Sequence, residues 1–133
     1  MIFIGREVID SLLTYSRMVH PKEGILLLRG RIKKGDLYIR EIVIPPLATH
    51  GMGFSSFSAY HLPMDFSIVG TAHSHPSGVL RPSIADLNHL FGRVMVIVAH
   101  PYASEKDIAV FDGEGRKLEF RIMENGSSNN GLY

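Results

Sequence analysis

The stretch Thr71-Ala72-His73-Ser74-His75-Pro76 places two histidines, separated by one residue, at the end of an apolar run. It continues through a short loop into Pro82-Ser83-Ile84-Ala85-Asp86, where Ser-x-x-Asp opens a segment with helical spacing. The pattern predicts a strand over residues 66–72, a polar loop, and a helix over residues 83–91. Open α/β sheets place their sites where such strands end. The rest of the chain can therefore be read outward from this stretch.

On the N-terminal side, a short edge strand (residues 1–4) precedes an amphipathic helix over residues 6–19. The helix is predicted because apolar residues recur there at helical spacing: Val8, Ile9, Leu12, Leu13 and Val19. His20-Pro21 ends it, since a residue before proline disfavours the helical conformation. The apolar run 24–28 and residues 37–44 follow as two strands, with a hairpin turn at Lys33-Lys34-Gly35-Asp36.

On the C-terminal side, the unbroken apolar run 94–99 predicts a central strand that is covered on both faces. Residues 108–111 and 117–122 are expected to form a last hairpin. Between the two halves, residues 47–64 are irregular, with a short strand over 54–60. The sequence thus predicts one mixed α/β domain over residues 1–123, a mixed sheet flanked by helices, followed by a flexible polar tail over 124–133.

The composition limits the classes of function. The 133 residues are 45% hydrophobic and carry a net charge of +1, so no basic surface for nucleic acid is indicated. The basic cluster Arg29, Arg31, Lys33 and Lys34 is interpreted as a solvated hairpin end. Cysteine is absent, which leaves His, Asp, Glu or water to hold any metal. No signal peptide or membrane span is evident, and a cytoplasmic location is expected.

The pair His73 and His75 can bind one ion, because residues i and i+2 of an extended chain point to the same side. Pro76 favours the extended conformation of His75 and so maintains this arrangement. Histidine is common in this chain, with seven copies, and such a pair can also be purely structural.

Ser83 and Asp86 also allow two interpretations. Their spacing fits a capping box, in which the two side chains satisfy the first amides of a helix. Residues i and i+3 also share a helix face, so Asp86 could bind a metal with Ser83 beside it. Ser104 and Asp107 show the same spacing with no adjacent histidine pair. Glu23, before the apolar run 24–28, is either a general base or a solvent-exposed residue of the turn.

Taken together, these residues resemble the JAMM motif of the MPN+ metalloproteases. That motif is a Glu far upstream, then His-x-His-Pro, six residues, and Ser-x-x-Asp, as in Glu23, His73-Ser74-His75-Pro76, Ser83 and Asp86. The resemblance extends to His20-Pro21-Lys22-Glu23 and to Ile68-Val69-Gly70-Thr71, and covers roughly residues 6–100. One feature departs from the family pattern: Gly24 follows the glutamate at once instead of about three residues later.

The resemblance implies a fold similar to the cytidine deaminases and one zinc ion per chain, held by His73, His75 and Asp86. Glu23 would act as general base, and Ser83 would hydrogen-bond the oxyanion. Ser74 and Pro76 would shape the loop. The activity implied is hydrolysis of the isopeptide bond between ubiquitin, or a ubiquitin-like modifier, and a lysine.

The short chain looks like the small free-standing archaeal or bacterial members of this family, whose substrates include modifier and sulfur-carrier proteins that end in Gly-Gly. Residues 51–54 are a candidate for one wall of the groove that would take this tail.

Two alternatives remain open: a zinc peptidase or amidase acting on small peptides or thiocarboxylate adducts, and a non-catalytic scaffold. Three of the other histidines are expected to be structural or exposed (His20, His89 and His100), and His50 and His61 are candidates for a substrate contact.

Overall fold

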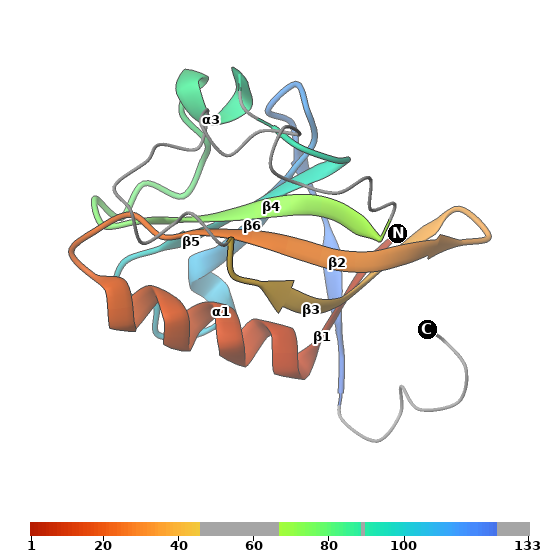
Figure 1. Ribbon diagram of the computed structural model, residues 1–133, viewed down its shortest axis with the longest axis horizontal. Helices are drawn as coiled ribbons and strands as arrows, with labels where there is room; N and C mark the ends of the chain where they lie inside the picture. Colours follow the sequence, from red (N-terminus) through yellow and green to blue (C-terminus); the bar gives the residue numbers. More distant parts are fainter. Residues whose placement is uncertain (46–66, 89, 125–133) are drawn as a thin grey trace.

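The computed structural model describes residues 1–45, 67–88 and 90–124. Its elements follow the chain as shown in Figure 1. They are β1 (Ile2–Gly5), α1 (Arg6–Val19), β2 (Ile25–Lys33), β3 (Asp36–Val43), β4 (Ile68–His75), α3 (Ile84–Asn88), β5 (Val94–Ala99), the 3₁₀ helix η2 (Glu105–Asp107), β6 (Ile108–Phe111), β7 (Lys117–Leu118) and β8 (Phe120–Met123). Helix α1 lies on one side of the sheet and α3 on the other, which confirms the mixed α/β fold with flanking helices.

The described strands form one mixed sheet in the order β7-β6-β5-β4-β2-β3-β1-β8. Strand β4 lies between β2, which is antiparallel to it, and β5, which is parallel to it. Every residue of β4 and of β5 is buried, because the sheet is covered on both faces at this point. The prediction of a central strand over 94–99 is confirmed. The strand that carries the histidines is thus one of the best supported in the molecule.

Helix α1 occupies the predicted residues because its apolar residues form one face. Val8, Ile9, Leu12 and Leu13 are buried and pack into the main core with residues of β1, β3 and β5. The helix ends where predicted: the amide of His20 donates to the carbonyl of Ser16, and Pro21 follows. The hairpin of β2 and β3 is also confirmed, with its turn at residues 33–36.

Two predictions about the sheet edges were wrong. Strand β1 is not an edge strand, because it pairs in parallel with β3 on one side and with β8 on the other. Residues 117–122 do not form one strand of a hairpin with β6. Of these residues, only those of β7 pair with β6, the ladder ends at Leu118, and β8 joins the opposite edge of the sheet. The parallel β1–β8 pairing joins residues far apart in sequence, so no local sequence pattern predicts it.

The strand with the histidines is longer at its C-terminal end than predicted, since β4 runs through His75 instead of stopping at Ala72. The following helix is shorter, from Ile84 to Asn88. Several predictions lie outside the described residues: the strand 54–60, the groove wall 51–54, the positions of His50, His61 and His89, and the tail beyond Glu124. Among the described helices, none has the length and apolar character needed to cross a membrane.

The contact between β4 and β5 depends on Gly70. A methyl group at this position would lie 2.2 Å from the carbonyl oxygen of Val94, a backbone atom that cannot move aside easily. We therefore expect Gly70→Ala to lower the free energy of unfolding by about 1–3 kcal/mol, measured by urea denaturation. Gly113→Ala is the control: the nearest atom there is the flexible end of Leu90 at 3.1 Å. Equal stability of the two variants would contradict this account.

Candidate metal centre

His73 and His75 point to the face of the sheet that carries α3. The register of β4 with β5 sets His73 beside Ile97 and Ser74 beside Val98. Ile97 belongs to a small core cluster with Leu80 and Leu90, whereas Val98 packs in the main core with α1. Because side chains alternate along a strand, both histidines face away from α1 and Ser74 faces it. The expectation that the two imidazoles share one side is confirmed.

The carboxylate of Asp86 meets both histidines. Its Oδ2 lies 3.0 Å from Nε2 of His75, and its Oδ1 lies 3.7 Å from Nδ1 of His73. All three residues are buried, with exposed fractions of 3% for His73, 7% for His75 and 9% for Asp86. Residues 73, 75 and 86 are thus brought together as the motif predicts. Buried charged groups of this kind are rare unless they are paired with each other or bind metal.

Asp86 is at the same time part of a capping box. The amide of Asp86 donates to Oγ of Ser83 (3.0 Å), and the amide of Ser83 donates to Oδ2 of Asp86 (2.9 Å). The two interpretations of Ser83-x-x-Asp86 therefore do not exclude each other. The cap fixes the carboxylate at the start of α3, and from there it reaches the histidines.

The other ring nitrogen of His75 identifies its tautomer. Nδ1 lies 2.9 Å from the carbonyl oxygen of Val79, an acceptor only, so this nitrogen carries a proton and donates it. In the neutral ring the lone pair then belongs to Nε2, which faces Asp86. Metal-binding histidines commonly have such a backbone partner on the second nitrogen. The sequence could not reveal this partner, because any residue supplies a carbonyl group.

The electrostatics of the site favour the charged forms of both His75 and Asp86. The hydrogen bond with Asp86 raises the pKa of His75; burial lowers it, and the Val79 carbonyl and the charges of Asp86 and Glu23 raise it further. Burial alone would raise the pKa of Asp86, but the hydrogen bonds from His75 and from the Ser83 amide, with the charges of both histidines, lower it to about 2. Asp86 is therefore an anion at neutral pH, as a metal ligand must be.

The donor set fits a zinc ion. As the side chains stand, no group of three or more His, Cys, Asp or Glu residues in the described ranges is arranged to hold a metal ion, and Asp86 instead contacts His75 directly. The two nitrogen–oxygen separations, 3.0 and 3.7 Å, bracket the value of about 3.3 Å between two ligands of one tetrahedral zinc. A zinc ion would take the place of the proton on Nε2 of His75, the nitrogen that faces Asp86. Two imidazoles and one carboxylate are a common catalytic zinc set.

Glu23 lies at an exposed position in the turn before β2. Its negative charge nevertheless contributes to the raised pKa of His75, so its carboxylate lies within electrostatic reach of the site. The next residue, Gly24, is buried, and a methyl group there would lie 2.7 Å from Tyr15 and 3.1 Å from Val19. The glycine that departs from the family pattern therefore lets this segment lie tightly against α1.

Ser83 is exposed beside the buried carboxylate of Asp86. Its Oγ accepts the amide of Asp86, which uses a lone pair and leaves the hydroxyl proton for another acceptor. None of the hydrogen bonds found within residues 1–45, 67–88 and 90–124 uses that proton. Ser83 can therefore donate to a group that enters the site.

A second cluster, not predicted from the sequence, lies next to the turn that carries Glu23. His20 stacks on His100, with ring centroids 4.7 Å apart, and both rings meet the edge of Tyr102. Nδ1 of His20 is 2.9 Å from the hydroxyl of Tyr102, and the amide of His100 donates to the carbonyl of His75. The two histidines were expected only to mark the ends of elements. Their shared His-Pro pattern was the one available signal.

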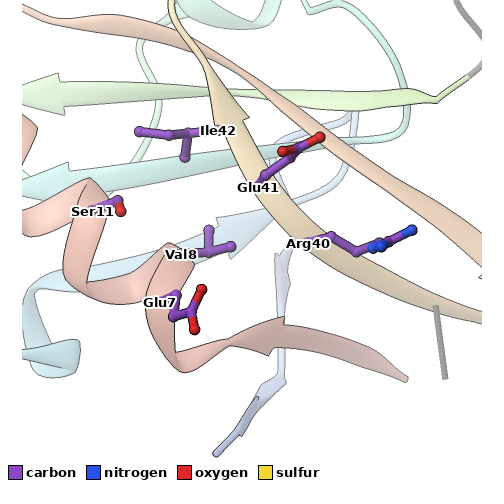
Figure 2. Close-up of a pocket in the computed structure, with 6 residues that line it drawn as sticks. All are labelled: Glu7, Val8, Ser11, Arg40, Glu41 and Ile42. Atoms are coloured by element: carbon purple, nitrogen blue, oxygen red, sulfur yellow. The ribbon is translucent and has the colours of Figure 1, made fainter. Parts of the chain in front are cut away.

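A separate surface recess of about 220 Å³ lies between α1 and β3. Figure 2 shows the six residues that line it: Glu7, Val8, Ser11, Arg40, Glu41 and Ile42. It contains no histidine and shares no residue with the centre formed by His73, His75 and Asp86. Its two carboxylates, Glu7 and Glu41, do not belong to any group of three or more metal-ligating residues in the described ranges.

Comparisons with known proteins identify the family of this chain. The family profile described as prokaryotic homologs of the JAB domain matches residues 5–113. A protein of Haloferax volcanii named a probable metalloprotease is 31% identical over 131 residues, which cover 93% of this chain and 81% of that protein.

Two solved structures share the fold. A JAB1/MPN domain protein from Archaeoglobus fulgidus is 28% identical, covers 93% of this chain and 98% of its own, and superposes with a TM-score of 0.69. A structure described as JAMM, a metalloprotease-like zinc site in the proteasome and signalosome, is 28% identical, covers 93% and 99%, and has a TM-score of 0.68.

Proposed function

This chain belongs to the family of prokaryotic JAB-domain homologues, within the JAMM/MPN metalloprotease-like proteins, and from that premise we propose that it is a zinc-dependent isopeptidase or peptidase. Its substrate would be a ubiquitin-like modifier or a sulfur-carrier protein, cut after the C-terminal Gly-Gly. His73, His75 and Asp86 would hold one zinc ion. Glu23 would accept a proton from the attacking water, and Ser83 would donate a hydrogen bond to the carbonyl oxygen of the substrate.

One observation carries the proposal: a buried carboxylate, Asp86, contacts two buried histidines from another element, beside an exposed serine and within electrostatic reach of an exposed glutamate. A scaffold protein has no physical need for this set. A lone histidine–carboxylate pair would serve stability less well than apolar side chains of similar size, because burying charge is costly. The set is therefore better explained by chemistry than by folding.

The residues divide the chemistry between them. When bound, the zinc ion would lower the pKa of a water molecule to about 7 and polarise the scissile carbonyl group. A carboxylate oxygen of Glu23 would accept a proton from the attacking water and pass it to the nitrogen of the leaving amine. Its exposed position suits this role, because water and substrate can reach the carboxylate.

Ser83 would stabilise the negative charge that develops on the carbonyl oxygen. Its hydroxyl oxygen is held in place by the amide of Asp86, so the proton is directed without further ordering of the side chain. The cap at the start of α3 would thus fix both a zinc ligand and the oxyanion donor.

The surface beside the site supports a protein as substrate. Val79, whose carbonyl group accepts the hydrogen bond from His75, has a side chain that is 44% exposed. Ile84, the first residue of α3, is 79% exposed. A protein substrate that reaches the site would cover these two side chains and so remove apolar surface from water. A narrow approach to the site would favour Gly-Gly, because residues without side chains can pass close to the backbone.

The proposal predicts a metal-dependent cleavage. We expect the purified protein to carry about one zinc ion per chain and to cleave both a modifier–lysine isopeptide and a linear Gly-Gly fusion. A chelator should abolish both zinc content and cleavage, and added zinc should restore them. The control is a fusion with Gly-Gly changed to Ala-Ala, which should resist cleavage. Full activity of the metal-free protein would overturn the mechanism, and cleavage of small peptides alone would favour the alternative substrate class.

A further inference from the structure

We propose that Ser74, between the two histidines, is a positioning residue for Glu23, and that Tyr102 supports the other end of the same turn. The inference rests on the proposed role of Glu23 as general base. It concerns residues that face α1, on the side of the sheet opposite the metal ligands. Neither side chain would touch substrate or metal.

Ser74 holds the residue after Glu23 with two hydrogen bonds. Its Oγ accepts the amide of Gly24 at 2.6 Å, and its own amide donates to the carbonyl of Gly24 at 3.0 Å. Ser74 and Gly24 are both buried, so water cannot easily replace the side-chain bond. The residue that lies between His73 and His75 in the chain is therefore also the residue that fixes the backbone next to Glu23.

The packing around Gly24 makes this contact rigid. An added methyl group there would meet Tyr15 at 2.7 Å, Val19 at 3.1 Å and Oγ of Ser74 at 3.2 Å. Gly24 is thus enclosed by α1 on one side and by Ser74 on the other. The segment can move away from this position only if the Ser74 bond breaks first.

The other end of the turn has its own support. The hydroxyl of Tyr102, a residue 1% exposed, bonds His20, which stacks on His100. The amide of His100 bonds the carbonyl of His75, so this support also ends on β4. The turn from His20 to Gly24 is therefore held at one end by β4, through Ser74, and at the other by His100 and Tyr102, which follow β5. Glu23 lies between the two supports.

Fixing both ends of this turn matters because the rate of proton transfer by Glu23 is sensitive to distance. A displacement of about 1 Å can cost roughly 100-fold in rate, even when it originates away from the reacting atoms. Glu23 is exposed, and within the described ranges its side chain has no hydrogen bond or ion pair that would fix it; its backbone must therefore do so. Ser74 provides one such constraint, through its hydrogen bond to the amide of Gly24.

The decisive variant is Ser74→Ala. We expect kcat to fall about 10- to 100-fold, with KM and zinc content unchanged. The amide of Gly24 should also lose protection from hydrogen exchange, a readout that needs no metal and no substrate. Tyr102→Phe, which removes only a hydroxyl group, should give a smaller loss of kcat with the same unchanged KM and zinc content.

A matched control lies on the same strand. Thr71 is fully buried, and its hydroxyl has no hydrogen-bond partner among the described residues. Thr71→Val removes this hydroxyl at constant shape and should leave kcat, KM and Gly24 exchange unchanged. A general disturbance of β4 would affect this variant as well.

A double-mutant cycle with Glu23→Gln separates positioning from structure. If Ser74 acts through Glu23, Ser74→Ala should have little further effect on the residual rate of Glu23→Gln, measured in single turnovers. An equal loss in both backgrounds, a wild-type rate for Ser74→Ala, or loss of zinc would each overturn the proposal. If Ser74→Ala fails to fold, Tyr102→Phe decides by the same criteria. If wild-type protein cleaves neither substrate, the proposed function fails, and this inference fails with it.

Discussion

Glu23→Gln should retain its zinc and lose hydrolysis, with kcat reduced by about 10²- to 10⁴-fold. Gln has the shape of Glu but cannot accept the proton of the attacking water at neutral pH. The three residues of the metal centre remain unchanged, so zinc content should stay at the wild-type value. Because Glu23 is exposed, the substitution should not disturb the core. The measurement is zinc content by metal analysis together with kcat on a Gly-Gly fusion.

The control for Glu23→Gln is Glu7→Gln, an equal change at another exposed glutamate, on α1 and away from the metal centre. This control should keep full activity, which excludes a general effect of the lost charge. Hydrolysis by Glu23→Gln at the wild-type rate would show that another group accepts the proton.

Asp86→Asn should lose zinc, with affinity reduced by more than about 100-fold, and activity should fall with it. Removing even an outer partner of a ligand costs about 10- to 100-fold in affinity, and here a charged ligand itself becomes neutral. The helix start should survive, because the side-chain carbonyl oxygen of the new amide can still accept the amide of Ser83. Zinc content and thermal unfolding of the same sample therefore report on the two roles separately.

Ser83→Ala provides the matched control for Asp86→Asn. It removes the hydroxyl that accepts the Asp86 amide but leaves the carboxylate, so stability should fall by about 1 kcal/mol while zinc remains bound. Unchanged zinc in Asp86→Asn, together with a loss of stability alone, would show that the residue is only a cap.

The sequence predicted those parts of the fold and site that depend on neighbours in the chain. His73 and His75 share a side because of the strand period, and α1 occupies residues 6–19 because of its apolar face. The capping box of Ser83 and Asp86 follows from a spacing of three residues. Each of these features is fixed by local geometry, which a sequence records directly.

What could not be predicted depends on contacts between distant residues. The pairing of β1 with β8 has no local signal, and neither does the bond between Ser74 and Gly24, fifty residues apart. Glu23 could be named as a candidate only from its place before the apolar run 24–28 and from its distance to the histidine motif. Glu23 is exposed, and its charge raises the pKa of His75. This proximity follows from the antiparallel pairing of β2 with β4, which brings the start of β2 beside His73.

The position of β8 has a consequence for chains that are shortened or still being synthesised. Strand β1 obtains its first partner, β3, early, but its second partner begins only at Phe120. Until that residue is present, the outer amides and carbonyls of β1 remain open, as an edge to which another chain can add. Arg6, the first residue of α1, donates hydrogen bonds to both Glu105 and Glu124, which follows β8. Strand β8, the last described strand, therefore covers this side of β1 only after the ribosome has reached Phe120, and β8 then becomes the edge of the sheet in its place.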